Sequence, residues 1–286
     1  MSGSAVALAL ISLFFNGCND TVFKKYAIKS RSRGMMIAGT GLIWTIWQCI
    51  YLEIFSGGIS IDILTIKYGL TAGLILVLAN ILLLESLTHL QVSLCATIYR
   101  LNTIGVVILS YVFLSEEVGF IKFIAIGLGI ASVLLLYNPS ERKIDQQLYF
   151  LFLIIVITAS ILRASYGVLS KYAIEQGASI LGMIPYTSIC WVIGGLLYAA
   201  MIEKRLRLTG KKFIYMLISG TLIFLTVTCL LLAISLSQAS IIIPIANCSF
   251  IVALCFSILL KLEQMNKRKF FAILIALASI IMLSRI

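Results

Sequence analysis

The chain has 286 residues, of which 61% are hydrophobic and only 12% are charged. Soluble domains carry about 25% charged residues, so this composition excludes an ordinary soluble domain and indicates an integral membrane protein. The net charge of +11 comes mainly from basic residues in short loops between apolar runs. There they orient the chain and contact membrane lipids, so the charge does not indicate nucleic acid as a partner.

Apolar runs long enough to cross a membrane, about 20 residues each, follow one another along the chain. They predict transmembrane helices at 3–23, 34–55, 67–87, 92–114, 119–137, 147–170, 180–201, 212–234, 240–260 and 269–285. The runs are too long and too continuous for the strands of a membrane barrel. We therefore expect an all-α integral membrane protein with ten transmembrane helices. Because no basic segment precedes the first run, we expect that run to be a retained span rather than a signal peptide.

The second half of the chain repeats the first about 147 positions later. The recurring positions are Gln91 as Gln238, Ser93 as Ser240, Glu116 as Glu263, Phe123 as Phe270, and Lys25-Tyr26-Ala27-Ile28 as Lys171-Tyr172-Ala173-Ile174. We expect one five-helix repeat at 1–137, a polar linker at 138–147 and a second five-helix repeat at 148–286. Five spans is an odd number, so the two copies should cross the membrane in opposite orientations. Inverted repeats of this kind rock about a central site in secondary transporters.

The basic residues are distributed unevenly between the two sides of these spans. The segments 24–33, 142–143, 204–212 and 261–269 together hold 16 of the lysines and arginines, whereas Lys67, Lys122, Lys171 and Arg285 lie on the other side. The positive-inside rule places the 16 in the cytoplasm and both termini outside.

Small residues predict where helices approach one another closely. Ala125 and Gly129 lie four residues apart in the fifth predicted span, and Ala272 and Ala276 occupy the equivalent places in the tenth. We expect these two spans to pack together within one chain, the alternative being contact with the second subunit of a homodimer. The seven cysteines lie inside apolar runs without CxxC spacing, which favours packing over disulfides or a metal site.

Ionisable residues at membrane depth cost at least about 2.5 kcal/mol each by insertion scales, so each needs a partner or a purpose. Thr97 and Arg100 share a face of the fourth predicted span with Ser93. The corresponding face of the ninth holds Ser240, Pro244 and Asn247. The repeat therefore places Arg100 and Asn247 opposite one another near the midplane, where such transporters bind substrate. Pro244 should also leave the carbonyl of Ser240 without its amide partner and free to bind a ligand.

Further polar groups lie at similar depth. These candidate substrate-binding residues are Asn16 and Asp20 in the first predicted span, Asn80 in the third, Arg163 and Tyr166 in the sixth, and Tyr186 in the seventh. Arginine binds carboxylate or phosphate through two parallel hydrogen bonds, so two arginines favour an anionic or zwitterionic substrate. Two alternatives stay open: Asp20 could neutralise Arg100 or Arg163 as a structural pair, or could carry a proton. Tyr186 could line a cavity or anchor the chain at the lipid interface. Glu116, Glu117 and Glu263 should serve helix ends.

Ten short spans in two halves, each closing its fourth span with a glutamate, resemble the EamA-type branch of the drug/metabolite transporter superfamily. Ser240 to Pro244 followed by Glu263 matches the proline-to-glutamate pattern of that family, whereas the first half has Thr97 in place of the proline. The resemblance implies export or exchange of small metabolites, with no cofactor. It also implies termini in the cytoplasm, opposite to the charge distribution.

The sequence bears on three possible functions. The leading one is a secondary transporter that moves a small polar metabolite by alternating access in a bacterial inner (plasma) membrane. A flippase or accessory subunit for a phosphorylated lipid-linked carrier is the alternative. An intramembrane enzyme is disfavoured, because His89 is the only histidine and GxSxG, HExxH and Walker motifs are absent.

Overall fold

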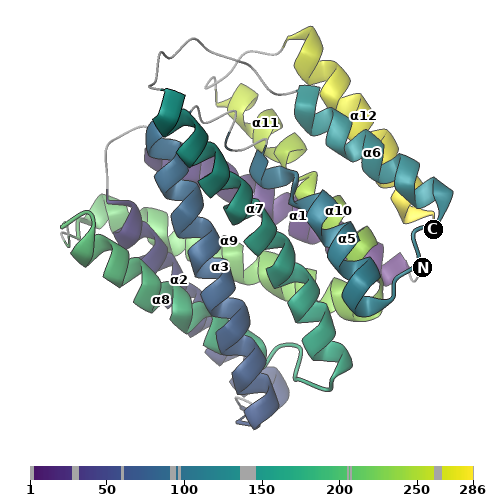
Figure 1. The fold of residues 1–286 in the computed structure, drawn as a ribbon. Coiled ribbons are helices and arrows are strands. Elements are labelled where there is room, and N and C mark those ends of the chain that lie inside the picture. The colour runs from purple at the N-terminus through teal and green to yellow at the C-terminus, as the bar shows by residue number, and fades with distance from the viewer. Residues whose placement is uncertain are drawn as a thin grey trace.

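The computed structural model describes residues 3–27, 32–58, 61–90, 95, 98–135, 146–204, 206, 208–260 and 266–285. Within them all regular structure is helical (Figure 1). The helices are α1 (Gly3–Ala27), α2 (Arg33–Ser56), α3 (Ile63–His89), α5 (Asn102–Leu114), α6 (Phe120–Leu135), α7 (Gln146–Glu175), α8 (Met183–Met201), α9 (Gly210–Leu236), α10 (Ala239–Asn247), α11 (Phe250–Leu259) and α12 (Lys267–Ser284).

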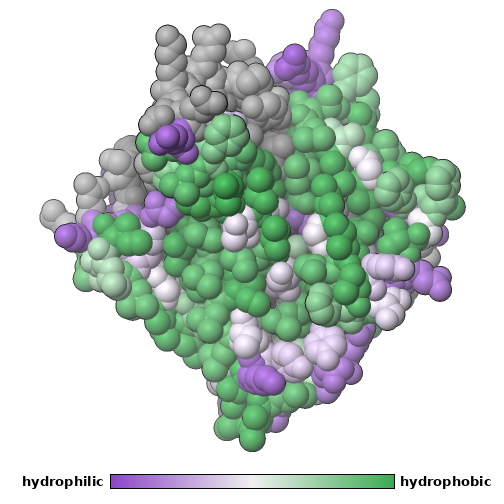
Figure 2. Space-filling view, in the orientation of Figure 1, coloured by the Kyte–Doolittle hydropathy of each residue, from purple (hydrophilic) through white to green (hydrophobic). Residues whose placement is uncertain are grey.

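Seven described segments are long and apolar enough to cross a membrane: Gly3–Phe23, Arg33–Phe55, Ile63–Ser86, Gln147–Glu175, Met183–Met201, Gly210–Leu236 and Ala239–Phe256. Two shorter apolar segments are Ile98–Leu114 and Phe120–Leu135. Hydrophobic residues cover the middle of the face in Figure 2, and most of its hydrophilic residues lie toward the edges. The protein is therefore a helical membrane protein, as its composition predicts.

The helices that begin the two halves, α1 and α7, end at opposite ends of α9. Tyr26 in the last turn of α1 packs edge-on against Tyr215 near the start of α9, with ring centroids 5.5 Å apart. Lys171 near the end of α7 donates a hydrogen bond of 3.1 Å to the carbonyl of Ile234 near the end of α9. We call the two ends of the bundle the Lys25 end and the Lys171 end.

The most extensive helix contacts join one half of the chain to the other. They are α2 with α8, α1 with α9, α3 with α7, α3 with α8 and α6 with α12. The α2–α8 contact depends on glycine, because a Cβ on Gly34 would lie 2.6 Å from the backbone nitrogen of Ala199. Small residues permit this close approach of backbones, which replaces the hydrophobic driving force that lipid does not provide.

The predicted packing of the fifth span on the tenth within one chain is confirmed. Ala125 in α6 and Ala272 and Ala276 in α12 are fully buried. Ser279 donates a hydrogen bond of 2.6 Å to the carbonyl of Ala125. A Cβ on Gly129 would lie 3.1 Å from the hydroxyl oxygen of Ser279. Small residues at this contact therefore allow both close packing and a bond between the two helices.

The span predicted at 240–260 is present as an apolar segment over Ala239–Phe256, but its helix is interrupted between α10 and α11. The amide of Cys248 bonds to the carbonyl of Ile245, and that of Ser249 to Ala246, so the turn tightens to bonds between residues three apart. The fourth span has a similar break, where the amide of Leu101 bonds to Ile98 before α5 begins. Leu101 and Cys248 are 147 positions apart. The two breaks therefore lie at equivalent places in the two halves.

Candidate functional site

Arg100 and Asn247 immediately precede these two breaks, and the structure brings them into contact. One terminal nitrogen of Arg100 donates to the carbonyl of Asn247 at 2.8 Å and to the hydroxyl of Ser249 at 3.1 Å. The break makes this bond available, because the last carbonyls of α10 no longer have helical amide partners. The predicted opposition of Arg100 and Asn247 is thus present as a direct contact between the two halves.

Asp20 in α1 forms the ion pair of this site. Its carboxylate accepts from the second terminal nitrogen of Arg100 at 2.5 Å. The side chains of Arg100 and Asp20 are 19% and 35% exposed, so both are largely removed from solvent. Of the two pairings that the sequence left open, the structure therefore contains Asp20 with Arg100 and not with Arg163.

Several neutral side chains extend the contact from Arg100. The amide of Asn247 donates to Asn102 at 2.6 Å and to Thr103 at 2.9 Å. The amide of Asn16 donates to the hydroxyl of Ser249 at 3.0 Å. We call this set the central network; its members are Asn16, Asp20, Arg100, Asn102, Thr103, Asn247 and Ser249. It joins α1, α5 and the α10–α11 break.

Arg163 and Tyr166 lie one turn apart on α7. The guanidinium carbon of Arg163 is 5.6 Å from the centre of the Tyr166 ring, a distance at which a cation is attracted to an aromatic face. Within the described part of the chain, Arg163 has no carboxylate partner. The hydroxyl of Tyr99 is buried without a hydrogen-bond partner among the described residues.

Sequence reasoning missed Tyr99, Asn102, Thr103 and Ser249. The repeat could have revealed two of them, because Asn102 and Ser249 are 147 positions apart and both polar. Tyr99 offered no such signal, since the importance of its hydroxyl depends on which side chains surround it.

Other predicted residues lie elsewhere or outside the described residues. Thr97 is not among the residues that the structure describes. Asn80 donates to the carbonyl of Leu76 in its own helix at 2.7 Å. Tyr186 lies in the first turn of α8 near the Lys171 end, with its Cβ beside Gly69. The prediction that the carbonyl of Ser240 faces a cavity is wrong, because Ser240 is completely buried.

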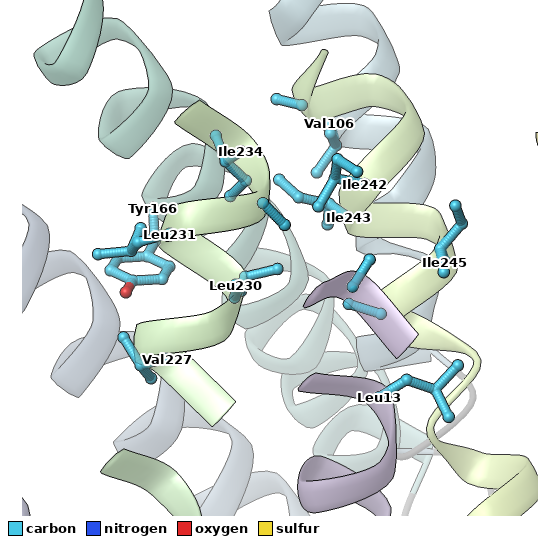
Figure 3. Packing of buried hydrophobic residues seen from close by; sticks show 14 of the residues in the cluster. Leu13, Val106, Tyr166, Val227, Leu230, Leu231, Ile234, Ile242, Ile243 and Ile245 are labelled. Carbon is cyan, nitrogen blue, oxygen red and sulfur yellow. The ribbon is translucent and has the colours of Figure 1, made fainter. Parts of the chain in front are cut away.

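Apolar packing closes the interior on the Lys171 side of the central network. Figure 3 shows this cluster, in which residues of α9 and α10 meet Leu13, Val106 and Tyr166. The side chain of Asp20, in the central network, is 35% exposed. The interior is therefore filled by apolar side chains between the network and the Lys171 end, where Glu116, Lys171 and Gln238 line an outer pocket of about 530 Å³.

A buried polar cluster lies at the closed end. The Glu116 carboxylate accepts from the backbone amides of Ala239 and Ser240 at 2.7 and 3.0 Å, and from the Ser240 hydroxyl. Glu116 thus caps α10 of the other half, so its predicted role at a helix end is confirmed. Lys122 lies 3.9 Å from Glu116 and donates to Gln238 at 2.8 Å. We call Glu116, Lys122, Gln238 and Ser240 the Glu116 latch. Glu263 lies outside the described residues.

Metal-ligating residues do not gather anywhere in the described part of the chain: no group of three or more His, Cys, Asp or Glu could hold an ion.

Comparison with known proteins identifies the family. No curated protein sequence matches this chain. A solved structure described only as "Crystal structure of protein" matches with a TM-score of 0.83 at 10% identity, over 99% of this chain and 96% of that one. At that identity the likeness shows the fold alone. The sequence model of the EamA-like transporter family matches residues 3–138 and again 150–285. The chain therefore belongs to the EamA-like transporter family, whose members are transporters rather than enzymes.

Proposed function

We propose that this protein is a secondary transporter that moves a small polar, anionic or zwitterionic metabolite by alternating access. One observation carries the proposal: the two halves meet at equivalent helix breaks, where Arg100 bonds to Asn247 and Asp20. In transporters with inverted repeats, broken helices of this kind form the substrate site near the bilayer midplane. Ten spans fit this mechanism, with 92–114 as the fourth and α10 with α11 as the ninth. A bacterial inner membrane is the proposed location.

The balance of charge supports a substrate that carries a negative group. Arg100 is offset by Asp20, whereas Arg163 has no carboxylate partner among the described residues. A cation in a water-poor interior is stabilised by an anion that binds beside it. A carboxylate or phosphate on the substrate would supply that charge.

In the proposed transport step, the Lys25 side would admit the substrate to the central network while the Glu116 latch and the apolar cluster keep the Lys171 side closed. Rocking of the two halves would then open the latch and close the Lys25 side. The central network lies where the halves meet, so its contacts change as they move.

Transport assays test this proposal. Ligands that bind the folded state raise its melting temperature by mass action, so amino acids, nucleotides, sugar phosphates and quaternary amines are first screened by thermal shift. We expect the hits to be anions or zwitterions and to show counterflow in liposomes. Asn247→Ala should lower counterflow at least about tenfold, the effect of losing about 1.4 kcal/mol of binding.

The matched control for this substitution is Asn80→Ala, because Asn80 bonds only within its own helix in the described structure. Counterflow should be kept in that variant. Hits restricted to cations would contradict the charge argument, and movement of lipid head groups without counterflow would replace the metabolite transporter with a lipid flippase.

A topology measurement tests the inverted repeat separately. Single cysteines replace Lys25 and Lys171 in a background without the native cysteines. We expect a membrane-impermeant maleimide to reach them from opposite sides of the membrane, since α1 and α7 end at opposite ends of α9. Reaction of both from the same side would remove the inverted repeat and, with it, the proposed mechanism.

A further inference from the structure

A groove runs between α1, α9 and α11 toward the Lys25 end. Its volume is about 690 Å³. Three helices line it. The lining residues are Cys18, Thr21, Val22 and Lys25 of α1, Lys211, Ile214, Tyr215, Ile218 and Leu222 of α9, and Phe256 and Leu260 near the end of α11. Lys25 and Lys211 are exposed and lie at the Lys25 end, whereas the wall along α9 is mainly apolar. The groove is thus positively charged at the Lys25 end and mainly apolar along the rest of its length.

The groove has the depth of one membrane leaflet. Leu222 is eleven residues beyond Lys211 in the same helix, a distance of about 16 Å at the helical rise of about 1.5 Å per residue. Half of a hydrocarbon core of about 30 Å is about 15 Å. When the two lysines lie at the head-group level, Leu222 therefore lies near the middle of the bilayer.

We propose that this groove binds one anionic phospholipid, with its phosphate between Lys25 and Lys211 and an acyl chain against Ile214, Ile218 and Leu222. Two lysines from different helices provide the charge complementary to a lipid phosphate. The apolar wall removes the acyl chain from contact with other lipids over the depth of a leaflet. Lipid binding at this site is separate from the central network, whereas its effect on conformation rests on the proposed transport function.

The proposed lipid would also connect the two halves of the protein. Lys25 belongs to the first half and Lys211 to the second, so a phosphate between them bridges helices that move relative to one another in alternating access. A ligand shifts a conformational equilibrium by its difference in affinity for the two states. The lipid therefore favours the arrangement in which the two lysines are close enough to share it.

The test uses the purified full chain in detergent, with phosphatidylglycerol or phosphatidylcholine of the same acyl chains added. We expect phosphatidylglycerol to raise the Tm by several degrees, with one molecule retained in native mass spectrometry, and phosphatidylcholine to do neither. In the double variant Lys25→Gln with Lys211→Gln, phosphatidylglycerol should cause only a small part of that increase in Tm. Lys204→Gln with Lys212→Gln is the matched control, because it removes the same charge at the same end from residues that do not line the groove, and it should keep the increase.

A third variant tests the apolar half of the site. Ile218→Trp fills the groove without changing charge and should also lose the retained lipid, while inorganic phosphate alone should leave the Tm of the unaltered chain unchanged. Equal losses in the two lysine pairs would overturn the proposal, since net charge would then explain the effect. Equal stabilisation by phosphatidylcholine, or a dimer in place of bound lipid, would overturn it too.

Discussion

Replacing Arg100 with glutamine will destabilise the folded protein more than the same change at Arg163. Arg100 donates to three groups at the meeting of the two halves, including the Asp20 carboxylate. The substitution leaves that partly buried carboxylate without its counter-ion. Breaking a fully buried pair costs about 3–5 kcal/mol. Since Asp20 is 35% exposed, we expect about 2 kcal/mol, measured as a lower unfolding midpoint in detergent.

Arg163→Gln is the matched control, because it removes a cation that has no carboxylate partner among the described residues. Its unfolding midpoint should change little. The double variant Asp20→Asn with Arg100→Gln should lose less stability than the two single variants added together, because each single change already breaks the same pair. If the stability lost in the double variant equals the sum of the losses in the two single variants, the interaction between Asp20 and Arg100 does not contribute to stability.

Much of the architecture follows from two features of the sequence, the apolar runs and the spacing of the repeat. The offset of 147 is sufficient by itself to pair Arg100 with Asn247. The repeat spacing does not identify the partner of Asp20, because Arg100 and Arg163 are both arginines at a similar predicted depth in the membrane. That choice depends on how α1 lies against α9 and α11, which is decided by side-chain packing over the whole helix.

The helix breaks show a second limit of sequence reasoning. Leu101 and Cys248 are ordinary helix residues, and neither predicts an interruption. Pro244 predicted only a carbonyl free to bind a ligand, and a carbonyl that accepts from Arg100 does follow it in the second half. That carbonyl belongs to Asn247 and not to Ser240, which is completely buried. The first half has no proline near its break, so the arrangement there depends on the tertiary contacts alone.

Replacing Glu116 with glutamine will open the Lys171 end of the protein. The carboxylate accepts from two amides and a hydroxyl at the start of α10 and lies 3.9 Å from Lys122. Glutamine has one acceptor oxygen instead of two and leaves Lys122, only 2% exposed, without its counter-ion. Because these contacts join the two halves across the closed end, their loss should favour the state in which that end is open.

A cysteine at Ile243 reports this opening, because Ile243 is 7% exposed and belongs to the apolar cluster at that end. In a background without native cysteines, its reaction with an impermeant maleimide from the Lys171 side should accelerate at least about tenfold in Glu116→Gln, the effect of about 1.4 kcal/mol on the equilibrium. Glu117→Gln is the control, since Glu117 is exposed and only its carbonyl bonds to Lys122. An unchanged rate together with a lower unfolding midpoint would make Glu116 a helix cap without a role in gating, and the closed end would then depend on apolar packing alone.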